Sequence, residues 1–239
     1  MAACRTTAAS SPARACSSSS AGNVDNSAGG TLAAQTDLTL TLTGELLNGQ
    51  DGLIFAKAGQ LSASASRIDN SAGTLQGQGD TNLKATGALG NQGGRVISQN
   101  GQLDLHSASL DNANGGVLNA ANGDLKLVTG TFSNNAGTTQ AKGLDITATG
   151  GIDNRAGHLS AVSGDNRIST ADLNNQGGGL DAGGLLYLRG NQLFNDGAAL
   201  GQGGKIGAGP RRQPHWRAEQ PVRPDRKQRQ PDPRRSQHQ

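Results

Sequence analysis

One short phrase recurs along this chain at nearly constant intervals, and this regularity constrains the fold more than any other feature. Written as apolar-x-Asn-x-x-(Gly or Ala), the phrase occurs nine times, and its asparagines lie 20 to 22 residues apart. These anchor asparagines are Asn26, Asn48, Asn70, Asn91, Asn112, Asn134, Asn154, Asn175 and Asn195. A fixed short period is typical of repeat architectures, in which each unit stacks on its neighbours.

The residues around each anchor keep the same register. The position two residues before the anchor is always apolar, and it is occupied by Val24, Leu46, Ile68, Leu89, Leu110, Phe132, Ile152, Leu173 and Leu193. The position five residues after the anchor holds Leu53, Leu75, Val96, Val117, Leu159, Leu180 and Leu200, whereas the first unit has Thr31 followed by Leu32 and the sixth has Thr139. We expect the apolar positions to share one core and the anchors to stack into a ladder of amide hydrogen bonds.

Between the anchors, apolar and polar residues alternate in short runs such as LTLTLTG (38–44), QLDLH (102–106) and LDITATG (144–150). A period of two indicates strands with one buried face, and the Asn-Gly, Gly-Gly and Asp-Gly pairs between the runs favour turns. The sequence therefore predicts an all-β fold, a β-solenoid of about nine coils with 20–22 residues in each coil. Leucine-rich repeats have a similar length, but they need a denser leucine pattern and a helical segment.

Composition supports a thin and repetitive core. The chain has 37 glycines among 239 residues, and aromatic residues make up only 2%. A chain so poor in bulky side chains cannot fill a thick globular interior, but a solenoid buries only a few side chains in each coil.

A second period, twice as long as the first, is superimposed on the repeat. Aspartate precedes the anchor at Asp25, Asp69, Asp111 and Asp153, which belong to alternate coils only. Stacked like charges repel one another, so alternation increases their separation. Duplication of a two-coil unit would produce the same pattern, and both explanations stay open at this stage.

The repeat occupies residues 23–207, and both flanking segments differ from it. We predict a disordered Ala/Ser-rich leader over residues 1–22 and a disordered basic Pro/Arg/Gln tail over residues 208–239, which holds nine of the 21 Lys and Arg residues. The leader contains the only cysteines, Cys4 and Cys16, and we expect them to be unpaired. The leader lacks the apolar run of a secretory signal, and an organellar transit peptide is an alternative interpretation of it. No stretch of the whole sequence has the apolar length of a membrane-spanning helix.

The change of composition at both ends of the repeat is abrupt. One hypothesis is that the two flanking segments are translated from a shifted or misassigned reading frame around a broken repeat gene. The alternative is that the basic tail is an evolved feature of the chain.

The motifs of common enzyme and metal sites are missing, so the sequence predicts no catalytic residue, no metal and no cofactor. One alternative is a polysaccharide-active β-helix enzyme, which would need acids gathered on one face, whereas the acids here are periodic. Another is nucleic-acid binding by the tail, through phosphate contacts of its arginines and stacking on Trp216. The basic residues of the tail follow no regular spacing, so we expect no specific nucleic-acid partner.

Phrases such as LDNANGGVL (110–118) and IDNRAGHL (152–159), repeated over residues 23–207, resemble the haemagglutinin repeats of filamentous-haemagglutinin-type exoproteins. The resemblance implies a right-handed parallel β-helix that forms part of a long bacterial surface filament. It also implies a secreted or cell-surface parent protein, an outer-membrane two-partner transporter, and a role in adhesion or contact-dependent toxin delivery at host or neighbouring-cell surfaces. No secretion domain or toxin domain is recognisable, so we expect an internal, non-catalytic shaft segment.

Overall fold

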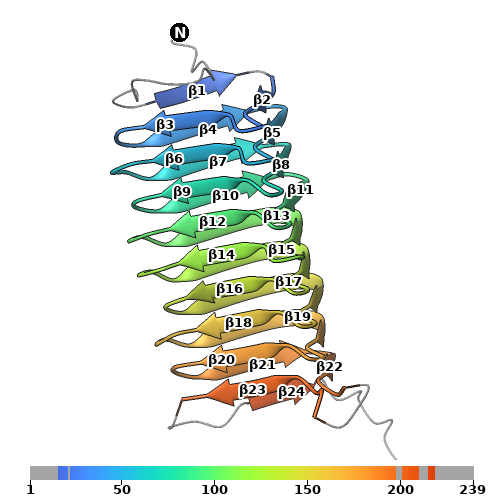
Figure 1. The fold of residues 1–239 in the computed structure, drawn as a ribbon. Helices are drawn as coiled ribbons and strands as arrows, with labels where there is room; N and C mark the ends of the chain where they lie inside the picture. Colours follow the sequence, from blue (N-terminus) through green and yellow to red (C-terminus); the bar gives the residue numbers. More distant parts are fainter. Residues whose placement is uncertain (1–15, 21, 198–200, 210–214, 219–239) are drawn as a thin grey trace, which may run out of the picture.

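The computed structural model describes residues 16–20, 22–197, 201–209 and 215–218, with side chains for 22–197 and 201–209. These residues form only strands and turns. The strands stack coil upon coil into a rod, with the N-terminal residues at one end and the C-terminal residues at the other (Figure 1). The predicted all-β solenoid is therefore confirmed.

One long side of the rod is a nine-stranded sheet, which we call sheet A. Each of its strands has four residues and begins just after an anchor turn. They are β3 (Thr31–Ala34), β6 (Leu53–Ala56), β9 (Thr74–Gly77), β12 (Arg95–Ser98), β14 (Val117–Ala120), β16 (Thr138–Ala141), β18 (His158–Ala161), β20 (Gly179–Ala182) and β23 (Lys205–Ala208).

The remaining strands form a fifteen-stranded sheet, sheet B. Its main row is β1 (Cys16–Ser20), β4 (Leu38–Leu42), β7 (Leu61–Ala65), β10 (Thr81–Ala85), β13 (Leu103–Asp111), β15 (Leu125–Ser133), β17 (Leu144–Asp153), β19 (Asn166–Asn174), β21 (Leu186–Gly190) and β24 (His215–Ala218). A short strand leads to the anchor in the other coils, namely β2 (Val24–Asp25), β5 (Glu45–Leu47), β8 (Arg67–Asp69), β11 (Ala88–Gly90) and β22 (Gln192–Phe194).

Every strand pair in both sheets is parallel, and equivalent residues of successive coils face each other. Leu46, for example, pairs with Val24 on one side and with Ile68 on the other. A slip of one residue would turn every buried side chain outward. The register therefore keeps each apolar position above its counterpart.

The core is the stack of inward side chains between the two sheets. Seven of the nine apolar positions before the anchors are buried, and Val24 and Leu193 at the two ends of the row are half-buried and packed against the core. In sheet B the row that runs through Leu61, Leu103 and Leu125 also contains two buried polar residues, Thr81 and Asn166. The core is thus thin, mainly aliphatic and continuous along the rod.

The position five residues after the anchor does not always point inward. Leu53 and Val117 are only half-buried, and the buried residues of their strands are the next ones, Ile54 and Leu118. These coils have one more residue in the anchor turn, which shifts the inward position by one. Leu200, predicted to be equivalent, lies outside the described residues.

The predicted boundaries at residues 22 and 208 are only partly covered by the structure. Strand β1 lies within the predicted leader and pairs with β4, and β24 lies within the predicted tail and pairs with β21. The rest of both segments lies outside the described residues, so their disorder stays a prediction. Within the described ranges, no helix has the length and apolar character needed to cross a membrane.

Candidate functional site

The nine anchors lie in a single row at the corner where sheet B passes into sheet A, which we call the asparagine corner. Along this row the side-chain Nδ2 of each anchor donates to Oδ1 of the next anchor. The links join Asn26, Asn48, Asn70, Asn91, Asn112, Asn134, Asn154, Asn175 and Asn195 in order, at 2.7 or 2.8 Å. Eight of these side chains are at most 1% exposed, and Asn195 is half-buried.

Each interior amide also holds the backbone of two coils. Asn91 Nδ2, for instance, donates to the carbonyl of Gly94 in its own turn at 3.2 Å and to the carbonyl of Val117 in the next coil at 3.2 Å. The Gly94 carbonyl also accepts the Val117 backbone N–H at 2.8 Å. The anchor amide therefore adds a side-chain hydrogen bond to the backbone pairing that joins the coils at this corner.

Among the described coils, the one that follows Asn134 has a polar residue at the first inward position of its sheet A strand, and its anchor receives an additional bond. Thr139 is fully buried, and its hydroxyl donates to Asn134 Oδ1 at 3.1 Å. At the N-terminal end of the row, Asn26 Oδ1 is buried and has no donor among the described residues.

A glycine closes each anchor turn, and in every turn after the first a side chain there would collide with the coil before it. A Cβ at Gly73 would fall on the carbonyl oxygen of Asn48, and a Cβ at Gly94 would fall on that of Asn70. The turns also use left-handed backbone, with φ of 56° at Ala72 and 61° at Gly93. The longer turns use two such residues, for example Asn114 at 56° and Gly115 at 82°, which accounts for their extra residue.

A second corner, where sheet A passes into the main row of sheet B, links coils in a different way. Aspartates alternate there with glycines, and we call it the aspartate corner. Its aspartates are Asp37, Asp80, Asp124 and Asp165, and the glycines in the intervening coils are Gly59, Gly101, Gly143 and Gly184.

Three of the four aspartates at this corner, all except Asp124, join their coil to the next coil through one charge-assisted hydrogen bond. Gln60 N donates to Asp37 Oδ1 at 2.9 Å, and Gln102 N donates to Asp80 Oδ1 at 2.8 Å. Leu185 N does the same to Asp165 at 2.9 Å. A Cβ on Gly59 or Gly101 would strike this carboxylate. Sequence reasoning missed this corner, although its aspartates recur 41 to 44 residues apart.

The aspartates that precede alternate anchors act within their own turn. The carboxylate Oδ1 of each aspartate accepts a hydrogen bond from the backbone N–H two residues later in the chain. The pairs are Asp25 with Ser27, Asp69 with Ser71, Asp111 with Ala113, and Asp153 with Arg155. The hydrogen bond from the Ser27 backbone holds the pKa of Asp25 below its usual value. Aspartate here is therefore a turn-forming residue.

Two of these carboxylates also form an ion pair with an arginine. Burial raises the pKa of Asp69, but hydrogen bonds from Ser71 and the Arg67 charge outweigh it, so the pKa of this carboxyl is lowered. The pKa of Asp153 is lowered chiefly by hydrogen bonds from the Arg155 side chain, at 2.7 and 2.9 Å, and burial opposes that shift.

The described residues do not gather the side chains of a metal centre. No cluster of three or more His, Cys, Asp or Glu side chains in the described ranges could hold a metal ion. His106 lies 3.0 Å from Asp104 on the surface, and His158 is exposed in a different coil. The polar interaction that recurs in every described coil is the amide row, which links the coils along the rod.

Comparison with known proteins gives one match. The family model described as haemagglutinin repeat matches residues 6–54, 50–93, 92–156 and 161–210, which together cover most of the chain. No curated protein and no solved structure matches the chain.

Proposed function

Because the chain belongs to the haemagglutinin-repeat family, we propose that it is a non-catalytic shaft segment of a secreted bacterial surface filament that serves adhesion or contact-dependent toxin delivery. In this role the segment holds other parts of the filament at a distance. Its outer-membrane two-partner transporter and a target-cell surface are partners of the parent protein, and the segment itself needs no cofactor.

The observation that supports this role is the uninterrupted amide row from Asn26 to Asn195. A spacer must resist bending and separation of its coils, and each step along this rod is joined by strand pairing on two sides and by a buried amide bond at the corner. Eight steps of about 4.8 Å correspond to a separation of about 38 Å.

The regular coil length argues against the enzyme alternative. No long loop interrupts the described coils between Asn26 and Asn195 to build a cleft, and the acids either close turns or lie on the surface in alternate coils. General acid–base catalysis needs two such groups on either side of one bond. A polysaccharide-degrading activity therefore has no site that supports it.

A distance measurement tests the spacer role. Spin labels on Thr31→Cys and Lys205→Cys, in the full chain with Cys4 and Cys16 replaced by serine, lie in the same outward row of the first and last strands of sheet A. We expect a narrow distance distribution near 38 Å, which shortens by about 10 Å when residues 68–109, two whole coils, are deleted. A broad distribution, or an unchanged distance after the deletion, would contradict the proposal, as would hydrolysis of a polysaccharide by the intact chain.

A further inference from the structure

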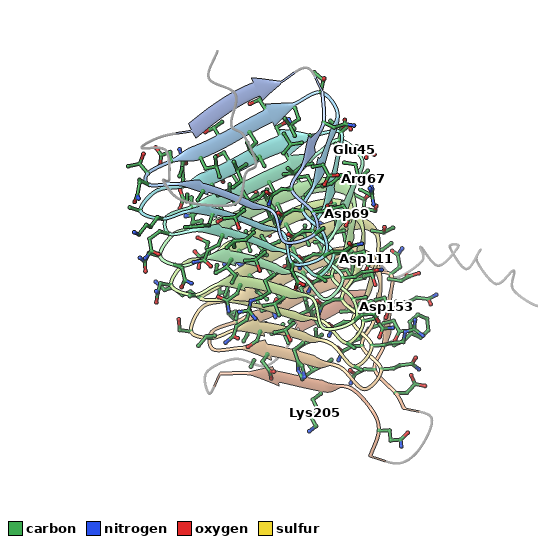
Figure 2. All side chains as sticks on the ribbon, turned by 45° about the horizontal axis from the view of Figure 1, so that its top comes forward. Glu45, Arg67, Asp69, Asp111, Asp153 and Lys205 are labelled. Carbon is green, nitrogen blue, oxygen red and sulfur yellow. The ribbon has the colours of Figure 1, made fainter. Side chains whose placement is uncertain are left out.

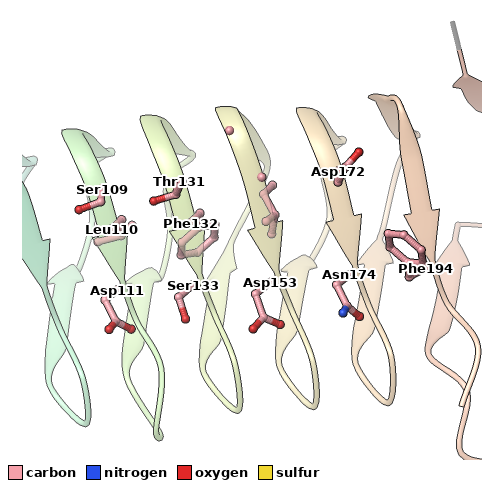
Figure 3. A pocket seen from close by; sticks show the side chains of 13 residues that line it. Ser109, Leu110, Asp111, Thr131, Phe132, Ser133, Asp153, Asp172, Asn174 and Phe194 are labelled. Carbon is pink, nitrogen blue, oxygen red and sulfur yellow. The ribbon is translucent and has the colours of Figure 1, made fainter. Parts of the chain in front are cut away.

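A shallow groove of about 570 Å³ runs along sheet B on the outside of the rod, across five successive coils (Figure 3). Its lining comes from β13, β15, β17, β19 and β22. Two rows of outward side chains border it, one through Ser109, Thr131 and Asp172 and one through Asp111, Ser133, Asp153 and Asn174.

The groove exists because one coil lacks side chains where its neighbours have them. Gly151 pairs with Thr131 in the coil before and with Asp172 in the coil after. The register shifts at this place on both sides of β17, next to Gly150. A glycine pair at such an irregularity leaves a notch in the surface of the sheet.

The side chains around the notch are rich in hydrogen-bond acceptors. The Asp172 side chain is exposed, and its carboxylate has no partner among the described residues. Asn174 uses its Oδ1 to accept the Gln176 backbone N–H at 3.1 Å. The Asp153 carboxylate accepts from Arg155. The groove thus presents carboxylates, hydroxyls and an amide, and it repels anions.

An exposed aromatic ring lies in the last coil of the groove. Phe194 occupies the position that Asp153 and Asn174 hold in earlier coils, and 43% of its surface is exposed. Among the residues with described side chains, the other exposed aromatic residue is Tyr187. A ring beside a row of polar groups combines an apolar face with hydrogen-bonding partners.

From these features we propose that the groove binds an oligosaccharide that is uncharged or carries ammonium groups, lying lengthwise along the rod. The apolar face of one sugar ring packs on Phe194, and hydroxyl or ammonium groups donate to Asp172 and Asn174. Repeating polar groups at coil spacing suit a ligand with repeating hydroxyls. The proposal is independent of the spacer role, because a rod that binds no sugar is still a rod.

Calorimetric titration of the full chain with three tetrasaccharides tests the proposal. The probes are a glucosamine tetramer, an N-acetylglucosamine tetramer and a sulfated tetramer. We expect the glucosamine tetramer to bind at least as tightly as the N-acetylated one, and the sulfated one not to bind at millimolar concentrations. Absence of binding by both unsulfated probes, or preference for the sulfated one, would overturn the proposal, and so would tighter binding of an arginine-rich peptide at the same site.

Three substitutions locate the site, and two of them have a matched control outside the groove. Phe194→Ala should weaken binding about tenfold, whereas Tyr187→Ala, outside the groove, should change it less than twofold. Asp172→Asn should weaken binding of the glucosamine tetramer more than binding of the N-acetylated tetramer, whereas Asp145→Asn should leave both affinities unchanged. Gly151→Thr should abolish binding by filling the notch, and its unfolding curve should stay close to wild type because a Cβ there meets only the Asp172 carbonyl, at 3.5 Å. Equal effects of groove and control variants would overturn the assignment.

Discussion

The two corners of the coil solve the same problem with different periods. At the asparagine corner every described coil carries the same residue, and each interior amide both donates to the next anchor and accepts from the previous one. At the aspartate corner the acid occurs only in alternate coils, and three of the four carboxylates accept a backbone N–H of the next coil beside a glycine. Figure 2 labels Asp69, Asp111 and Asp153, which precede alternate anchors and follow one another along one side of the rod.

The difference follows from the chemistry of the two side chains. An amide is its own hydrogen-bonding complement, so identical residues can stack without limit. An ionised carboxylate only accepts, and two of them in contact repel each other. A carboxylate therefore needs a hydrogen-bond donor in the next coil. A turn with glycine supplies a backbone N–H there, because without a side chain the turn can approach the carboxylate closely. This accounts for the two-coil period at the aspartate corner, while the alternation of Asp25, Asp69, Asp111 and Asp153 stays open between charge separation and duplication.

The largest expected effect concerns the glycine that closes an anchor turn. Gly73→Ala places a Cβ on the Asn48 carbonyl oxygen, and neither backbone can move without breaking the row. We expect a loss of about 3 kcal/mol or more in the free energy of unfolding, measured by urea denaturation. In Gly115→Ala the added Cβ meets open space, so only the left-handed backbone is strained, at about 1–2 kcal/mol. Equal losses would mean that the close approach of coils is not what requires glycine.

Exchanging amide and carboxylate should affect the two corners unequally. Asn91→Asp buries a charge, removes the donor to Asn112, and places a carboxylate oxygen against the carbonyl oxygens of Gly94 and Val117. We therefore expect the free energy of unfolding to fall by about 3–5 kcal/mol. Asp80→Asn keeps an oxygen that accepts from Gln102 on an exposed side chain, and should cost about 1 kcal/mol or less. Urea unfolding of both variants measures the difference. Similar losses in the two variants would remove the distinction between the corners.

A double-mutant cycle sharpens the reason for the glycine at the aspartate corner. A Cβ at Gly143 would lie 2.9 Å from Asp124 Oδ1, with its next neighbour at 3.4 Å. We expect Gly143→Ala to cost about 1–2 kcal/mol and most of this loss to disappear in the presence of Asp124→Ser. If the two changes are additive in thermal or urea unfolding, the carboxylate is not what excludes a side chain at Gly143.

The smallest effect is a pH dependence confined to the carboxylates. The lowered pKa of Asp153 means that its ion pair stabilises the fold above the unfolded pKa of about 3.9, and this contribution is lost as pH falls through the lower folded value. Asp153→Asn should therefore lose about 0.5 kcal/mol at pH 7 and match wild type below that folded value. A difference that persists in acid would assign the effect to packing instead.

Much of this arrangement is predictable from periodicity, because the anchors and the apolar residues before them sit at fixed spacings. The prediction that the fifth residue after the anchor points inward was wrong at Leu53 and Val117. The turns of these coils contain one extra left-handed residue, which the spacing of the anchors alone does not indicate. The aspartate corner was detectable in the recurrence of Asp37, Asp80, Asp124 and Asp165, but its meaning depends on which backbone N–H lies above each acid. The groove beside Phe194 was not predictable, since it arises from a local register shift at Gly151.

The most direct test of the amide row is hydrogen exchange of the asparagine side chains, measured by NMR on protein labelled with 15N-asparagine. If the row holds the coils together, the Nδ2 protons of the anchors from Asn48 to Asn175 should exchange far more slowly than those of Asn100 and Asn122, which bond to each other on the surface. Asn195 should show intermediate protection, because it is half-buried at the end of the row. Rapid exchange at the interior anchors, at the same rate as Asn100, would contradict the account.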